Sequence, residues 1–139
     1  MSRRDSYHHI VREALESKGW IITDDPLDLS TGGVELLADL GAERLLAAQK
    51  GTERIAIEVK SFLSQSLISE FHKALGQYQN YRFALSAIEP EHTIWLAVPK
   101  DTWEGFFQRT FIQEVIQNTK MYVLVVDIHQ KSIVQWIKP

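Results

Sequence analysis

The expected fold of this chain depends on one stretch, Glu53-Arg54-Ile55-Ala56-Ile57-Glu58-Val59-Lys60-Ser61-Phe62. Side chains alternate between the two faces of a strand, so its three β-branched residues share one face while Glu58 and Lys60 share the other. With a second carboxylate from a neighbouring strand, this pair could hold a divalent cation and orient a water against a phosphodiester. The triplet by itself favours the alternative, a solvated strand face with ordinary surface charges, because exposed strands often carry such pairs.

The residues before this stretch predict a hairpin and a third strand. Lys50-Gly51-Thr52-Glu53 has the composition of a hairpin turn, which makes 44–49 a strand although its residues would also allow a helix. Residues 34–41 predict a further strand, and Asp39 lies on it. Asp39 is therefore the candidate for the second carboxylate beside Glu58.

Together these residues could form a metal site. Mg²⁺ usually binds one or two carboxylates together with water and substrate phosphate, which Asp39 and Glu58 would provide, and the backbone carbonyl of Val59 adds an oxygen between them. Lys60 would position the attacking water or stabilise charge in the transition state. Two carboxylates repel a phosphate unless a cation is bound, so phosphodiester cleavage at this site would require Mg²⁺ or Mn²⁺.

A helix of about three turns is predicted before the first strand, with its apolar stripe starting at Tyr7 and Gly19 placed just after its end. Glu13 lies on its polar face, which is either solvated or turned towards the metal site. The adjacent His8 and His9 point about 100° apart on such a helix, so we expect surface or capping histidines and no ligand cluster.

A longer helix is predicted after Ser66, which can cap it. Its polar stripe comprises Glu70, Lys73, Gln77 and Tyr81. If the helix packs on the sheet, Lys73, Gln77 and Tyr81 could be aimed at Glu58 and Lys60. The alternative, a solvated stripe with both side chains as bystanders, is about equally favoured.

The rest of the chain predicts further strands that complete the core. The runs 92–98 and 121–127 are almost continuously apolar, as is typical of strands buried on both faces, and 132–137 predicts a last strand. Asp127 is more typical of a turn-initiating aspartate than of a site residue. We find no repeat or linker, so we expect a single domain over 1–139, of the α/β class, with a mixed central sheet flanked by helices.

The amino-acid composition excludes several classes of protein and of binding site. The 139 residues contain no apolar run near the roughly 20 that span a bilayer, and the N-terminus does not mark export, so we expect a cytoplasmic protein that does not bind membranes. Zero cysteines exclude a thiolate zinc site and a disulfide framework. The formal net charge of -3 is unlike that of a free-standing duplex-binding protein, so contact with DNA would need local positive charge, a metal or a partner.

Two motifs resemble known nucleases. Ala38-Asp39 followed by Glu58-Val59-Lys60 resembles the PD-(D/E)xK signature, with alanine in place of its proline, and Gln77-Tyr78-Gln79-Asn80-Tyr81 resembles the QxxxY motif of some of these enzymes. The whole chain resembles the XisH family, the fdxN-element excision controlling factors of cyanobacteria. The residues that carry this resemblance are Gly19-Trp20, Asp25-Pro26-Leu27, Ala38-Asp39-Leu40-Gly41-Ala42-Glu43, Ile57-Glu58-Val59-Lys60-Ser61-Phe62, Ala74-Leu75-Gly76-Gln77-Tyr78 and Trp136-Ile137.

The resemblance implies a restriction-endonuclease-like core and an accessory role in site-specific excision of a DNA element, beside a recombinase and an XisI-type companion protein. On this hypothesis Asp39 and Glu58 bind Mg²⁺, Lys60 is the catalytic lysine, and the remaining site residues, Glu13, Gln77 and Tyr81, support them. One alternative is a non-catalytic module that docks the recombinase or the companion. Another is a nuclease or toxin subunit of a defence system, and a homodimer also stays open.

Overall fold

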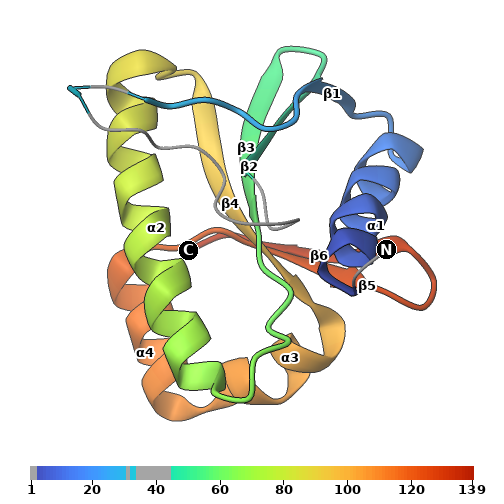
Figure 1. The fold of residues 1–139 in the computed structure, drawn as a ribbon, viewed down its shortest axis with the longest axis vertical. Coiled ribbons are helices and arrows are strands. Elements are labelled where there is room, and N and C mark those ends of the chain that lie inside the picture. Colours follow the sequence, from blue (N-terminus) through green and yellow to red (C-terminus); the bar gives the residue numbers. More distant parts are fainter. Residues whose placement is uncertain (1–2, 31, 34–44) are drawn as a thin grey trace.

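The computed structural model describes residues 3–30, 32–33 and 45–139, with side chains described from Ser6 onward (Figure 1). The predicted strand at 34–41, and Asp39 with it, lies outside these residues. The elements in chain order are α1 (Arg3–Ser17), β1 (Ile21–Asp24), β2 (Leu45–Lys50), β3 (Glu53–Val59), α2 (Leu67–Ile88), β4 (His92–Pro99), α3 (Lys100–Glu104), the 3-10 turn η1 (Phe106–Gln108), α4 (Thr110–Thr119), β5 (Val123–Asp127) and β6 (Ser132–Ile137).

The described strands form one mixed sheet in the order β1-β2-β3-β4-β5-β6. The pairs β1/β2, β2/β3 and β5/β6 are antiparallel, whereas β3/β4 and β4/β5 are parallel. Each parallel pair is joined by a helical crossover, α2 in the first and α3 to α4 in the second, as parallel pairing requires. The predicted hairpin is confirmed, with Gly51 in its turn at a φ of +62°. The expected α/β class with a mixed sheet flanked by helices is confirmed as well.

The sheet has helices on both faces. Figure 1 shows α2 and α4 on one side of the sheet and α1 on the other. Two hydrophobic clusters correspond to these layers: Ala56 of β3 belongs to the cluster that contains the buried side of α2, and Ile57 belongs to the cluster that contains α1. The predicted alternation of β3 is therefore observed, because adjacent residues of this strand pack into different layers.

The helix ends follow their sequence signals. Gly19 has a φ of +90° and donates its N–H to the carbonyl of Glu16, while Trp20 donates to Leu15, which is the Schellman arrangement. At the start of α2 the hydroxyl of Ser66 accepts a hydrogen bond from the N–H of Ser69 at 3.3 Å. No described helix is long and apolar enough to cross a bilayer.

One prediction for α1 is wrong. His8 is buried, and its Nε2 lies 3.0 Å from Oδ1 of Asp25, so it is neither a surface nor a capping residue. Arg12 donates to the other carboxylate oxygen of Asp25 at 2.7 Å. Asp25 comes after β1 and is distant in sequence, so helix periodicity alone could not reveal this pairing.

Candidate functional site

Glu58 and Lys60 are buried. Glu58 is 2% exposed and Lys60 is 4% exposed, which excludes the solvated strand face. Glu58 lies between β2 and β4, opposite Leu45 and Leu96, and the N–H of Lys60 donates to the carbonyl of Ala97 at 3.2 Å. This bond extends the pairing of β3 with β4 by one residue, so Lys60 keeps the alternation and faces the same layer as Glu58, the layer of α2.

Most of the buried polar side chains lie close together in the sequence, between the end of β3 and the first turn of α2. Of the described residues, five polar or charged side chains are buried, and they are His8, Glu58, Lys60, Ser61 and Glu70. All but His8 lie at the end of β3, directly after it, or in the first turn of α2, and each of these four has an interaction partner. Burying a charge costs several kcal/mol unless it is compensated, so such a concentration is typical of functional sites.

Helix α2 turns part of its polar stripe towards the sheet. Glu70 is 7% exposed and Tyr81 is 6% exposed, whereas Gln77 is half-buried and Lys73 is exposed. Tyr81 therefore faces the sheet layer that also receives Glu58, and Gln77 lies at its margin.

Sequence reasoning did not single out Glu70 as a site residue. It belongs to the polar stripe of the predicted helix, whose orientation the sequence pattern leaves open. The signal that could have found it is the second spacing in which it takes part, because Glu70, Ala74, Tyr78 and Tyr81 recur at the helical repeat and are all buried.

Tyr78 connects this helix to the sheet. Its hydroxyl donates to the carbonyl of Ile94 at 3.0 Å and accepts from the N–H of Tyr122 at 3.0 Å. Burial raises the pKa of Tyr78, and the negative charge of Glu58 adds to this effect.

The structure brings some predicted site residues together and leaves others apart. Tyr81 is buried in the cluster on the α2 side of the sheet, and Glu58 and Lys60 are buried at the end of β3, where the alternation of the strand turns both side chains towards the same layer. Glu13 is exposed on α1, the helix on the other face of the sheet, and stays outside this group. Val59 is buried on the α1 side, with only its backbone carbonyl available as a ligand.

The described donors fit the expected ion in chemical type. A buried carboxylate and a backbone carbonyl are hard oxygen donors, which Mg²⁺ and Mn²⁺ accept. Glu70 adds a second buried carboxylate on the opposite element. Lys60 supplies the positive charge that a phosphate would need beside these acids.

An open cavity of about 390 Å³ adjoins this group at Ser61. It lies where β3 and β4 end, and its walls come from α1, α3 and the β5–β6 turn, through Tyr7, Asp101 and His129. Open α/β sheets bind ligands outside the carboxyl ends of their parallel strands, and this cavity has that position.

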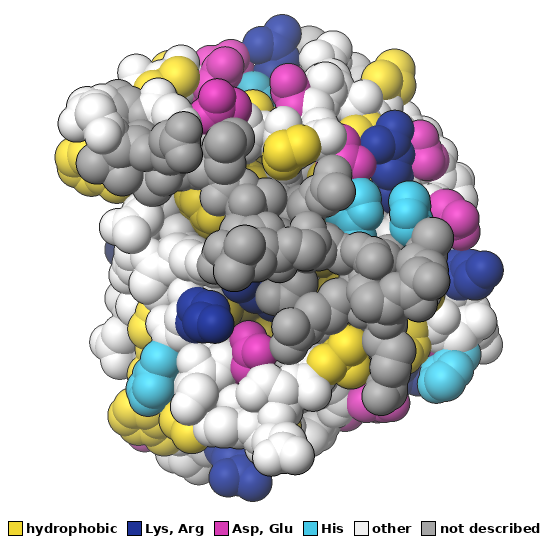
Figure 2. Space-filling model, in the orientation of Figure 1, with side chains coloured by type: hydrophobic (Ala, Val, Ile, Leu, Met, Phe, Trp, Pro, Cys, Tyr) yellow, Lys and Arg dark blue, Asp and Glu magenta, His cyan; other side chains and the backbone are white. Residues whose placement is uncertain are grey.

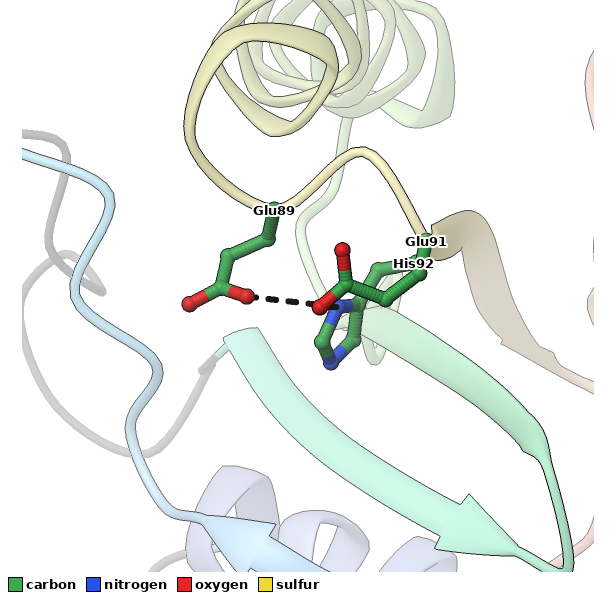
Figure 3. Close-up of side chains that lie close together, drawn as sticks. All are labelled: Glu89, Glu91 and His92. Carbon is green, nitrogen blue, oxygen red and sulfur yellow. Dashed lines mark ion pairs between the residues drawn. The ribbon is translucent and has the colours of Figure 1, made fainter.

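A second group of carboxylate and imidazole side chains lies at the other end of the parallel strands. Figure 3 shows Glu89 at the end of α2 and Glu91 with His92 at the start of β4. Nδ1 of His92 is 3.8 Å from Glu89 and 4.0 Å from Glu91, and Arg54 donates to Glu91 at 3.0 Å. Arg54 already pairs with Glu91, so the arrangement is that of a surface ion-pair network.

Charge on the visible face is mixed. Figure 2 shows Lys and Arg side chains interspersed with Asp and Glu, and the coloured side chains do not form a broad basic surface. This agrees with the formal charge of -3.

The fold and the site define a mixed α/β protein with a buried glutamate and lysine at the end of a parallel strand. The chain belongs to the XisH family, whose model, described as XisH protein, matches residues 1–134. Among curated proteins none matches.

Two crystal structures are similar over nearly the whole chain. An XisH family protein from Nostoc punctiforme PCC 73102 is 48% identical, with a TM-score of 0.90 over 96% of this chain and 100% of that one. An fdxN element excision controlling factor protein from Anabaena variabilis is 49% identical, with a TM-score of 0.89 over 96% of this chain and 99% of that one. The resemblance predicted from the motifs is thus confirmed at the level of the family.

Proposed function

We propose that this protein is a controlling factor in the site-specific excision of a DNA element, and that it acts on DNA as a metal-dependent endonuclease of the PD-(D/E)xK type. The role in excision is supported by its 49% identity to the excision controlling factor of Anabaena variabilis. The observation that carries the nuclease activity is the burial of Glu58 and Lys60 side by side in one layer.

Each residue of the proposed nuclease site has a separate role. Glu58, the carbonyl of Val59 and Asp39 would hold Mg²⁺ or Mn²⁺, which when bound supplies a Lewis acid at the scissile phosphate. Lys60 would place its ammonium against the charge that develops on the phosphate oxygens. Tyr81 and Gln77 would line the substrate side of the site from α2.

The net negative charge of the chain indicates that it contacts DNA together with other proteins. A chain with net charge -3 and mixed surface charge gains DNA contacts most readily through another protein. The partners we propose are an XisI-type companion and a site-specific recombinase. The location we propose is the cytoplasm, because a chain without cysteines fits a reducing compartment.

The test is cleavage of plasmid DNA with Mg²⁺ or Mn²⁺, with and without the companion. Lys60→Met and Glu58→Gln should each lower the rate by roughly 100-fold or more, the usual cost of losing one stabilising group. The double variant removes both buried charges, so neither is left unpaired, and it should be folded and inactive.

Glu114→Gln, an exposed carboxylate of α4, is the matched control and should keep full activity. Melting curves establish that each variant is folded. Equal residual cleavage in the control and in the folded double variant would show that the activity comes from a contaminant.

The acidic balance also favours a second candidate, a non-catalytic module that docks the recombinase or the companion on this fold. A stable complex that survives Glu58→Gln, without cleavage under any metal, would select this candidate over the nuclease.

A further inference from the structure

A groove of about 690 Å³ lies at the end of the sheet opposite to Lys60. Three indoles and three ammonium groups line it, and they belong to Trp20, Trp95, Trp136, Lys18, Lys50 and Lys138. We call it the indole groove. The turn that begins β3 forms one of its walls through Gly51, whereas Lys60 follows the end of that strand, so the groove is separate from the buried charges.

The charge of the indole groove is opposite to that of the chain. Lys18, Lys50 and Lys138 are exposed, and Glu53 is the one carboxylate among the residues that line it. The stem of Lys50 lies along the end of α1, where a side-chain carbon at Gly19 would be 3.5 Å from its Cε. Three cations and one anion in a protein of net charge -3 make this a local site for a polyanion.

The aromatic wall of the groove is rigid. Trp136 is half-buried, and its ring lies 5.7 Å from that of Trp20 and 4.9 Å from that of Trp95, edge-to-face with the latter at 83°. Trp20 and Trp95 are buried and fix Trp136 between them. The Nε1 of Trp95 is buried and has no hydrogen-bond partner among the described residues.

Lysines beside a fixed aromatic ring are the elements of a single-strand nucleic-acid site. Ammonium groups follow the phosphates, and an aromatic face accepts an unpaired base, whereas in a duplex the base faces are covered by stacking. An acidic peptide would use the lysines but would leave the indole unused. The aromatic component therefore favours nucleic acid over an acidic protein.

We propose that the indole groove binds single-stranded DNA, with phosphates at Lys18, Lys50 and Lys138 and a base against Trp136. The inference rests on the proposed function, since it presumes that the protein works on DNA. It assigns to that function a second contact site, at the other end of the sheet from the proposed centre of cleavage.

The test uses tryptophan fluorescence of the full chain in a Trp103→Phe background. The chain has four tryptophans, of which Trp103 lies on α3 away from the groove, so the remaining signal comes from the groove. Oligothymidylate should quench this signal. With three phosphate contacts, log K should fall against log salt with a slope of about -2, since each contact on a single strand contributes about 0.7.

Lys18→Gln, Lys50→Gln and Lys138→Gln should each reduce that slope by about 0.7, and the triple variant should lose salt-dependent quenching. These side chains are exposed, so folding is not at risk. Lys131→Gln, an exposed lysine of the β5–β6 turn outside the groove, should bind like the parent. Lys60→Met should also bind normally while losing cleavage, which separates failure of this inference from failure of the proposed function.

Equal binding by the triple variant would overturn the proposal. Tighter binding of another ligand than of oligothymidylate would also overturn it. A duplex of the same length would assign the groove to duplex DNA, an oligouridylate would assign it to RNA, and polyglutamate would assign it to an acidic protein.

Discussion

At the scale of single residues, Tyr78 shows how a buried polar group is used for structure beside a functional site. Its hydroxyl donates to the carbonyl of Ile94 on β4 and accepts from the N–H of Tyr122, the residue directly before β5. It therefore sets the distance of α2 from the sheet, and with it the position of the layer that contains Glu58.

Tyr78→Phe should lower the free energy of unfolding by about 1–3 kcal/mol, because two buried backbone groups lose their partner. Burial raises the folded-state pKa of Tyr78, so its contribution is complete below the ordinary tyrosine pKa of about 10 and is lost as the pH rises through the raised value. Urea unfolding between neutral and alkaline pH measures both effects.

In Tyr78→Phe the part of the alkaline loss that is due to this residue should disappear. Tyr122→Phe keeps the hydroxyl of Tyr78 and serves as the control. An alkaline profile unchanged by Tyr78→Phe would contradict this account.

At the scale of elements, α1 is tied to the turn after β1 by the carboxylate of Asp25, whose side chain is 12% exposed. Asp25 accepts from Arg12 at 2.7 Å and pairs with His8 at 3.0 Å. Both partners are on α1, one turn apart. The carboxylate therefore holds the helix against β1 and also restricts the sliding of the helix along the helix axis. Hydrophobic packing alone would leave the helix freer to slide.

Asp25→Ala should lower the free energy of unfolding by about 2 kcal/mol, because hydrogen bonds to charged groups are lost and His8 stays buried without its partner. Arg12 is partly exposed, which limits the loss. Chemical denaturation measures the change. Asp24→Ala removes an exposed carboxylate from the neighbouring position and should change stability by only a few tenths of a kcal/mol. Equal effects of the two substitutions would contradict the assignment.

At the scale of the whole molecule, the six strands among the described residues form one sheet, and segments distant in sequence come together at each of its two ends. The buried charges lie where β3 ends, and the indole groove lies where β3 begins. A metal bound at the first end would stabilise the entire fold, since it binds the folded state alone.

Mg²⁺ at about 100 times its dissociation constant should therefore add about 2.7 kcal/mol to the free energy of unfolding and raise the Tm by several degrees. The increase should be absent in Glu58→Gln and retained in Glu114→Gln. Thermal unfolding at constant ionic strength measures it. A rise of the same size in Glu58→Gln would show that the ion binds elsewhere.

Local features of this protein are determined by its sequence alone. The alternation of β3, the hairpin at Gly51, and the helix ends at Gly19 and Ser66 all depend on residues within a few positions of each other. Steric and hydrogen-bonding preferences act over that distance, so they can be derived without a fold. The motifs also identified the family, because they extend over the whole chain.

Burial was decided only by the tertiary structure. Glu58, Lys60 and Glu70 carry charges that a sequence pattern assigns to solvent, and His8 was expected at the surface or as a capping residue. Whether each is covered depends on α2 and on the turn after β1, which come from other parts of the chain. The cost of burying a charge depends on partners that tertiary packing alone brings together, and so the strongest sign of a functional site appears only in the folded protein.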